Sequence, residues 1–323
     1  VKDFVGLKRK KPIQQVFEIL ASTQCYGQQL PNYGDDAAVI PRGKEFLLLA
    51  TDGMMPGLIY NEPYAAGKAA VMVTVNDIYA MGGRPLGMVN VLASGDQLQR
   101  EQILKGIEKG CHKLQVPMLG GHLHPDVQKE MPSLSVAILG QARKLLRGHL
   151  ARPQEDLILA VDLQGQPGCT SVQSWDANSG KSSGEILNRL EAMPLIAEQG
   201  WSQTAKDVSN AGILGTLAIM LENSGLGGVI DLQQMPCPQG IEMKDWLLCF
   251  QSFGFVLSVP PSYSREVIDQ FEKRQVSARV VGRVEKQRKL YVRSRQEECL
   301  FFDFEQESIT GISCLDKAPI SKK

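Results

Sequence analysis

The sequence has no excess of charge of either sign. Its 323 residues include 35 Lys+Arg and 35 Asp+Glu, so it lacks the basic character that nucleic-acid-binding proteins normally need. It also has no apolar run of the ~18 residues needed to span a bilayer. Residues 1–12 lack the apolar core of a signal peptide. We therefore expect a protein that binds neither nucleic acid nor membrane.

Several short motifs are missing as well. The seven cysteines are scattered with no CxxC pair, which argues against a disulfide scaffold and favours reduced thiols in a cytoplasmic protein. No Cys or His pair completes a tetrahedral zinc site with His122 and His124. GxGxxG and GxSxG are absent, and SGKSSG at 179–184 is not a P-loop because Trp175 occupies the position of its first glycine.

The composition is that of an ordinary globular protein, and the length predicts two domains. Apolar runs and amphipathic stretches alternate, so we expect a mixed fold (α+β or α/β) with domains at 1–148 and 149–323. Its predicted strands are 46–50, 86–93, 116–119, 133–140, 157–163, 228–232, 254–259 and 278–284. Its predicted helices are 63–81, 96–115, 184–198 with an interruption at Pro194, 211–224 and 264–275.

Five aspartates lie at the edge of, or within, apolar segments: Asp35, Asp36, Asp52, Asp77 and Asp207. Asp-Gly and Gly-Asp pairs are common in turns, so a structural role is also open for each one alone. Asp77 differs because its helix neighbours Val73, Thr74, Ala80 and Met81 cannot pair with it. If it is buried, its carboxylate needs a metal or a donor from elsewhere in the fold.

An all-carboxylate cluster suits a hard ion, and Mg²⁺ in proteins is typically bound by carboxylates together with substrate phosphates. The helix start near residues 209–211 would offer free N–H groups and a favourable dipole to a phosphate. The residues alone therefore predict a Mg²⁺–nucleotide site.

The same segments resemble a known superfamily. YGDDAAVI, LLATDGM, AAGKAAVMVTVNDIYAMGGRPLGMV, LGGH and DVSNAGILGTL occur in the order and spacing of the aminoimidazole ribonucleotide (AIR) synthetase, or PurM-like, superfamily. Thiamine-monophosphate kinase, selenophosphate synthetase and HypE are members. The resemblance spans residues 34–285 and is most specific in NDIYAMGGRP.

This resemblance implies a homodimer in which the N-terminal sheets pair into a barrel, with a layered α/β C-terminal domain covering each cleft. It implies ATP and Mg²⁺ as cofactors and a small-molecule substrate that is phosphorylated or activated. The aspartates Asp35, Asp36, Asp52, Asp77 and Asp207 would be metal ligands. The nucleotide would contact Asn76, Gly120, Gly121, Asn210 and Gly212.

The branch within the superfamily stays open. His122 after Gly-Gly is similar to selenophosphate synthetase, but residues 1–11 lack that enzyme's reactive Cys, and the ending DKAPISKK has no terminal Cys as in HypE. A group related to AIR synthetase with another acceptor fits best, and a thiamine-monophosphate kinase-like or selenophosphate synthetase-like kinase is the alternative. A non-catalytic nucleotide-binding dimer is also open. Asp77 and His122 are the candidate catalytic residues, His122 being the only candidate base.

A polar, glycine-rich segment at 165–185 follows the first predicted strand of the second domain. Loops of this length are uncommon without a function, although a mobile surface excursion is the alternative. An exposed Trp175 next to Asp176 and Asn178 would suit recognition of a small polar substrate.

Overall fold

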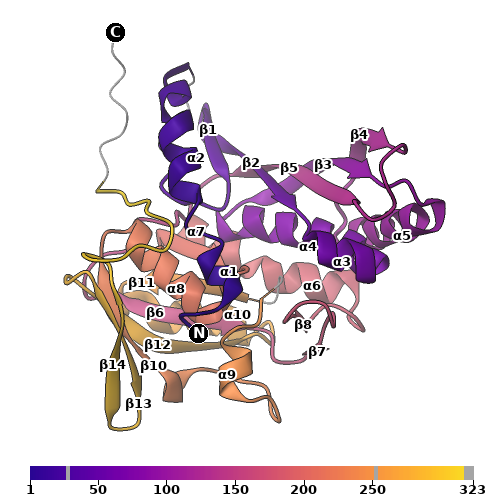
Figure 1. Ribbon diagram of the computed structural model, residues 1–323. Helices are drawn as coiled ribbons and strands as arrows, with labels where there is room; N and C mark the ends of the chain where they lie inside the picture. Colours follow the sequence, from indigo (N-terminus) through magenta and orange to yellow (C-terminus); the bar gives the residue numbers. More distant parts are fainter. Residues whose placement is uncertain (27–29, 251–253, 316–323) are drawn as a thin grey trace.

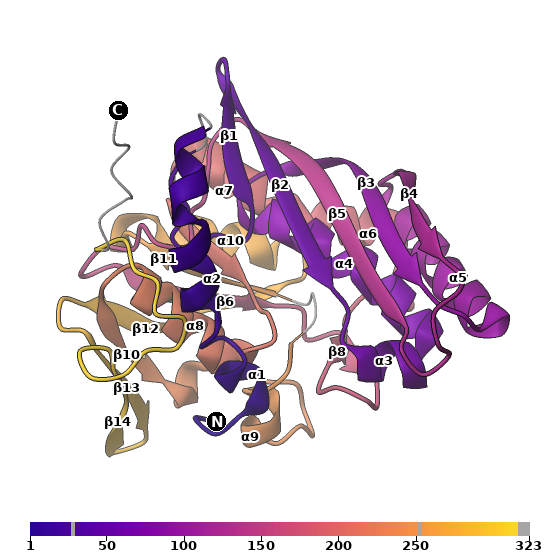
Figure 2. The same cartoon turned by 45° about the horizontal axis from the view of Figure 1, so that its top comes forward.

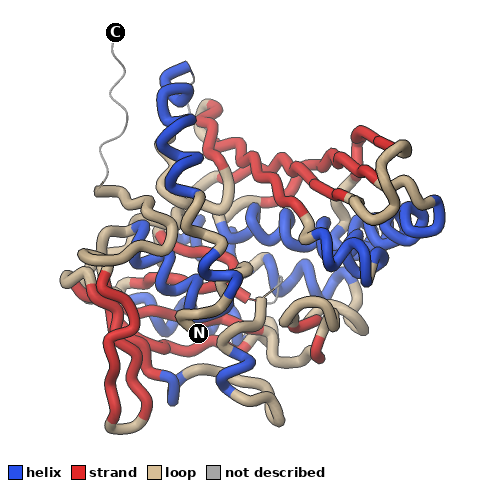
Figure 3. Tube along the Cα trace, viewed as in Figure 1, coloured by secondary structure: helices blue, strands red, loops and turns tan. Residues whose placement is uncertain are grey.

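A computed structural model describes residues 1–26, 30–250 and 254–315. It contains two sheets that lie in separate halves of the chain, joined by residues 143–155 (Figures 1 and 3). The expected mixed α/β fold of two domains is confirmed. None of the helices in the described parts is long and apolar enough to cross a bilayer.

The first sheet has five strands in the order β1-β2-β5-β3-β4. The strands are antiparallel except for the pair β3 and β4. Their bounds are β1 Ala38–Arg42, β2 Glu45–Gly53, β3 Arg84–Ala93, β4 Met118–His124 and β5 Ser133–Ala142. Helices α3 (Pro56–Asn61), α4 (Pro63–Ala80) and α5 (Gln97–Leu114) lie on one face, and the opposite face is open (Figure 2).

Helix α4 is the central element of this domain. Pro63 starts it at a position where a missing N–H costs nothing, and most of its side chains are buried because it packs between the sheet and α5. In α5 the predicted apolar positions Ile103, Ile107 and Leu114 are buried, whereas Leu98 is exposed. The position of Asp77 is therefore set by a helix held on two sides.

The second sheet has seven strands in the order β14-β13-β10-β12-β6-β11-β9. Their bounds are β6 Asp156–Val161, β9 Thr204–Asp207, β10 Gly227–Asp231, β11 Gly254–Val259, β12 Ser277–Glu285, β13 Lys289–Ser294 and β14 Glu297–Asp303. Alternate residues of β6 point to opposite faces. Ile158 joins the core shared with α4, and Leu159 joins the core around α8. Both faces are thus covered.

The remaining elements surround this sheet. They are α6 Ser183–Leu190, α7 Ala192–Gln199, α8 Gly212–Asn223, α9 Met243–Trp246, α10 Ser264–Glu272, the short pair β7 Gln166–Pro167 and β8 Trp175–Asp176, and the N-terminal α1 Val5–Lys8 and α2 Ile13–Leu20. Leu7 of α1 belongs to the core of the second half. The start of the chain therefore packs against the C-terminal domain, although we predicted it as part of the first.

Two sequence-based bounds are wrong. The predicted strand 116–119 instead runs to His124, so the Gly-Gly pair lies inside β4; its parallel hydrogen bonds to β3 hold the glycines extended. The helix predicted at 184–198 breaks at Glu191 and not at Pro194, because proline is tolerated in the first turn of α7.

Candidate functional site

Three of the predicted aspartates meet in one cavity of about 170 Å³. Asp52 comes from the end of β2, Asp77 from α4 and Asp207 from the end of β9, so both domains contribute. We call this the acid pocket. Its further lining includes Lys10, Ser209 and Asn210. The tertiary structure therefore joins carboxylates that are 25 and 130 positions apart in the chain.

The carboxylates of the acid pocket have raised pKa values. Burial raises the pKa of Asp77 well above its ordinary value, and the negative charges of Asp207, Asp36 and Asp52 add to the effect. Burial and Asp36 raise the pKa of Asp207 to about 8. Burial also raises the pKa of Asp52. When ionised, these carboxylates repel each other, and a bound cation would remove this repulsion.

Lys10 also lies in the acid pocket, although it was not among the predicted site residues. Burial and the neighbouring Lys206 lower its pKa, although Asp207, Asp52 and Asp36 act in the opposite direction. It is held there because α1 packs on α8, and Gly6 lies against the backbone of Asn210, just before that helix. The N-terminal segment thus delivers an ammonium group to the carboxylates.

Asp36 is linked to the acid pocket through Lys206. The two side chains form a buried ion pair, and the backbone N–H of Asp207 donates to Oδ2 of Asp36 at 3.2 Å. Burial alone would lower the pKa of Lys206, but Asp36, Asp207 and Asp35 outweigh it and raise the pKa. Asp36 therefore lies beside the acid pocket and is already paired with the ammonium group of Lys206.

Asp35 has a different environment. Its Oδ2 accepts from Arg147 Nε at 2.7 Å, and its Oδ1 accepts from the backbone N–H of Gly148 at 2.7 Å and lies 3.1 Å from His149 Nδ1. Burial opposes ionisation, but the hydrogen bonds from His149 and Arg147 lower the pKa of Asp35. This predicted metal ligand does not line the acid pocket; it fastens the first domain to the interdomain segment.

The side chains of the acid pocket are of the type that binds a hard cation, but in this structure they are not placed to bind one together. Within the described residues, no three His, Cys, Asp or Glu side chains are placed to hold a metal ion directly. The carboxylates of Asp52, Asp77 and Asp207 provide oxygen-only ligands of the kind Mg²⁺ prefers. The raised pKa values and the incoming Lys10 both indicate that this pocket attracts positive charge.

Two of the five predicted nucleotide-binding residues, Asn76 and Asn210, line cavities, and the two cavities are different. Asn210 lines the acid pocket. Asn76 lines a neighbouring cavity of about 40 Å³, and its buried Nδ2 has no hydrogen-bond partner among the described residues. At the start of α8 the backbone N–H of Gly212 donates to Ser209 and that of Ile213 to Leu247. Two of the expected phosphate donors are therefore engaged within the chain.

Gly120, Gly121 and His122 lie elsewhere, on the edge strand β4. Their side of the sheet is exposed, and the His122 ring packs edge-on against His124 with centroids 4.5 Å apart. Gly121 is required by packing, because a Cβ there would lie 2.5 Å from the carbonyl oxygen of Asn90. Strands β5 and β3 separate β4 from Asp52 on β2. Within one chain these residues do not reach the acid pocket.

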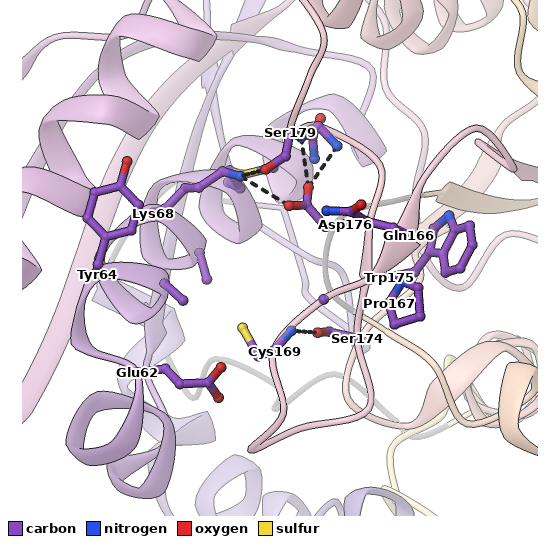
Figure 4. Close-up of a pocket in the computed structure, with 15 residues that line it drawn as sticks. Glu62, Tyr64, Lys68, Gln166, Pro167, Cys169, Ser174, Trp175, Asp176 and Ser179 are labelled. Carbon is purple, nitrogen blue, oxygen red and sulfur yellow. Dashed lines mark hydrogen bonds and ion pairs between the residues drawn. The ribbon is translucent and has the colours of Figure 1, made fainter.

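The segment at 165–185 is fastened to the first domain. Trp175 is buried and donates from Nε1 to the carbonyl of Asp162, so the expectation of an exposed Trp175 is wrong. Asp176 and Asn178 line a second cavity of about 260 Å³, shown in Figure 4. Lys68 of α4 reaches Asp176 across this cavity. Lys68 was not among the predicted site residues, although its position nine residues before Asp77 on the same helix marks it in the sequence.

Comparison with known proteins assigns the family. The model of AIR synthase related protein, N-terminal domain, matches residues 34–142, and that of the C-terminal domain matches residues 170–295. This chain belongs to the AIR synthase related proteins. The resemblance inferred from the motifs is confirmed.

The relatives of this AIR synthase related protein include uncharacterised proteins and a named enzyme. Uncharacterised proteins of Synechocystis and Methanocaldococcus jannaschii are each 36% identical over 316 residues, which is 96% of this chain and 95% and 97% of theirs. A selenide, water dikinase of Carboxydothermus hydrogenoformans is 31% identical over 65% of this chain and 62% of its own length.

Solved structures share the fold at low identity. PurL of Thermotoga maritima complexed with ATP matches with a TM-score of 0.75 and 17% identity over 92% of this chain. This chain spans about half of that protein, 51% of its length. A ThiL complexed with AMPPCP and TMP matches with a TM-score of 0.67 and 17% identity, covering 89% of this chain and 96% of that one.

Proposed function

We propose that this protein is an ATP- and Mg²⁺-dependent enzyme that phosphorylates or activates a small metabolite. The observation that carries the proposal is the convergence of Asp52, Asp77 and Asp207, from both domains, on one cavity with raised carboxylate pKa values. Selenide, water dikinase among the relatives, and nucleotide complexes among the structural neighbours, support ATP as the cofactor.

In the proposed enzyme the three carboxylates hold Mg²⁺, and Ser209 and Asn210, which precede α8, line the same cavity. Bound Mg²⁺ supplies neutralisation of phosphate charge and alignment for in-line attack. The aspartates then act by binding and orienting rather than as bases. Lys10 occupies the position of positive charge in the free protein, so we expect cation binding to compete with it.

Calorimetric titration with ATP, with and without Mg²⁺, tests the cofactor site. We expect Mg²⁺-dependent binding that Asp77→Asn weakens at least about 100-fold, because the change removes a ligand charge with little change in shape. Asp269→Asn on the exposed surface of α10 is the matched control and should bind as the wild type does. Wild type that binds no ATP in Mg²⁺, or an Asp77→Asn variant that binds normally, would refute the site.

We further propose a homodimer formed through the open face of the first sheet. Apolar side chains are exposed along this face, at Ile40, Leu49, Val89, Val91, Leu119 and Leu139. Monomers rarely leave such a contiguous surface uncovered. In such a dimer, Gly120, Gly121 and His122 of β4 could lie close to the acid pocket of the second copy.

Sedimentation velocity tests the dimer. Val89→Asp places a charge on the open face and is expected to convert dimer to monomer, whereas Leu98→Asp, on exposed α5, should leave the dimer unchanged. A wild type that sediments as a monomer at micromolar concentration would contradict the proposal.

A non-catalytic nucleotide-binding dimer is the second candidate, and the placement of Lys10 in the acid pocket favours it because an ammonium group there competes with a metal. Release of ADP separates the two candidates. Thiamine monophosphate and selenide are the substrates to test for the kinase-like alternatives. Mg²⁺-ATP binding without ADP release for any acceptor would support the non-catalytic protein.

A further inference from the structure

The 260 Å³ cavity lies between the domains, beside α4 (Figure 4). Tyr64 and Lys68 line it from the first domain, and Pro167, Trp175 and Asp176 line it from the β7–β8 segment of the second. We call it the interdomain cavity. It is slightly smaller than typical sites for drug-sized ligands, about 300–1,000 Å³, and so suits a small metabolite.

Two charged side chains of the first domain hold the loop of the second. Glu62 accepts hydrogen bonds from the backbone N–H of Thr170 at 3.1 Å and of Ser171 at 2.8 Å, and from the hydroxyl of Ser171. Lys68 Nζ donates to Ser179 Oγ at 2.6 Å and contacts Asp176 Oδ2 at 3.4 Å. The cavity wall is therefore fixed in place rather than a mobile excursion.

The two ends of the cavity differ in charge. The hydrogen bonds from Ser171 and Thr170 lower the pKa of Glu62, so it is ionised at neutral pH. No Lys or Arg of the described residues forms an ion pair with it. At the other end the ammonium of Lys68, with its side chain 16% exposed, has three N–H groups and uses two on Ser179 and Asp176. One end is thus negative, and the other retains a cationic donor.

Amide side chains without hydrogen-bond partners among the described residues line the interdomain cavity and the small cavity that adjoins it. The side chains of Gln166 and Asn178 line the cavity and make no hydrogen bond to other described residues, although Asn178 is only 7% exposed. Asn178 also lines the adjoining 40 Å³ cavity, which contains the unpartnered amide of Asn76. Polar groups therefore continue from the interdomain cavity to the residue next to Asp77.

Helix α4 sets the spacing between the two sites. Lys68 precedes Asp77 by nine residues and Glu62 precedes it by fifteen. At about 1.5 Å per residue, Lys68 lies roughly 13 Å along the axis from Asp77 and Glu62 roughly 22 Å. A molecule in the cavity would therefore have its Lys68 end nearer the acid pocket.

We propose that the interdomain cavity binds the phosphoryl acceptor, and that this acceptor is a small bipolar amine with its amino group at Glu62 and a carboxylate or hydroxyl group at Lys68. The inference rests on the proposed function. In the transfer, the acceptor oxygen forms a bond to the γ-phosphorus of ATP, and the bond from that phosphorus to the β–γ bridging oxygen breaks. ADP leaves with the electron pair, and a hydroxyl acceptor loses its proton to water.

The test measures ADP release from Mg²⁺-ATP with defined probes. The amine panel is the twenty protein amino acids, ethanolamine and glucosamine, and each has an amine-free counterpart where one exists: lactate for alanine, malate for aspartate, ethylene glycol for ethanolamine, and glucose for glucosamine. We expect at least one amine to stimulate ADP release at least 10-fold while its counterpart does not. Equal stimulation by both, or none by any amine, overturns the assignment.

Three variants locate the binding site of that amine. Glu62→Gln and Lys68→Met remove one charge each, and Ala69→Leu fills the cavity without touching the ion pairs. Each is expected to raise the KM for the amine at least 10-fold and leave the Kd for Mg²⁺-ATP within twofold. Lys105→Met on exposed α5 is the matched control and should change neither. An unchanged KM in all three variants would refute the proposal that the amine binds in the interdomain cavity.

The two measurements separate a failure of the acceptor site from a failure of the proposed nucleotide site. If Mg²⁺-ATP binds and Asp77→Asn abolishes binding, but no amine stimulates turnover, the interdomain cavity is refuted and the nucleotide site stands. If the wild type does not bind Mg²⁺-ATP, the proposed function itself is wrong.

Discussion

Asp35 and Asp77 are carboxylates of the same domain with opposite surroundings. Asp35 has both oxygens bonded, to Arg147, the N–H of Gly148 and His149, and its pKa is lowered. The carboxylate of Asp77 has no hydrogen-bond partner in the described parts of the chain, and burial beside three other carboxylates raises its pKa. Burial is common to both; the supply of donors separates a carboxylate that stabilises the fold from one left available to bind a cation.

The largest expected difference between the two is in stability. Asp35→Asn leaves Arg147 buried without its counter-charge, which typically costs about 3–5 kcal/mol of unfolding free energy. Asp77→Asn removes a repelling charge, so its unfolding free energy should equal or exceed that of the wild type. Urea denaturation at pH 7.5 measures both.

Asp3→Asn controls for the loss of an ion pair in general, because the Asp3–Lys8 pair is exposed and should contribute nothing measurable. Equal destabilisation by Asp35→Asn and Asp77→Asn would break the comparison, since it would mean that Asp77 also has a stabilising partner.

A further effect is expected in the pH dependence of the unfolding free energy. The pKa of Asp207 is about 8 in the folded protein, against about 3.9 for an aspartate in an unfolded chain. Between these values the folded protein binds a proton that the unfolded chain has released. The free energy of unfolding therefore falls as pH rises from 4 to 8, by up to about 1.4 kcal/mol per unit for this group.

Asp207→Asn removes this contribution, so its unfolding free energy should fall less steeply than that of the wild type between pH 5 and pH 8. Urea denaturation at pH 5, 6.5 and 8 measures the two slopes. Parallel curves would indicate that Asp207 is ionised throughout and that the acid pocket is already neutralised by Lys10 and Lys206.

Much of the first domain was predictable because its signals are local. The run at 46–50 predicted β2, and Pro63 with the following apolar residues predicted α4 to within two residues of its end. The strand pair β13–β14 was not predicted, since it is short, polar at its turn and defined by pairing with β10. Sheet order depends on contacts between distant segments, which periodicity does not report.

The candidate site was predictable in its acids and not in its cations. Asp52, Asp77 and Asp207 stand out against apolar neighbours and do line one cavity. Lys10 lies in a basic N-terminal stretch where an ordinary exposed charge is expected, so nothing local marks it, and only its spacing from Asp77 marks Lys68. Glu62, an acid of the interdomain cavity, was not predicted either. Trp175 was expected to be exposed because its neighbours are polar, but it packs edge-on against Trp246, 71 residues away.

The sequence by itself determined which carboxylates exist and the helix and strand ends that carry them, because glycine turns and apolar periodicity act over a few residues. Only the tertiary structure decided which carboxylates are paired. Arg147 reaches Asp35 across 112 positions of the chain, and Lys206 reaches Asp36 across 170. Coulomb interactions depend on distance in space and on burial, and the fold alone sets both.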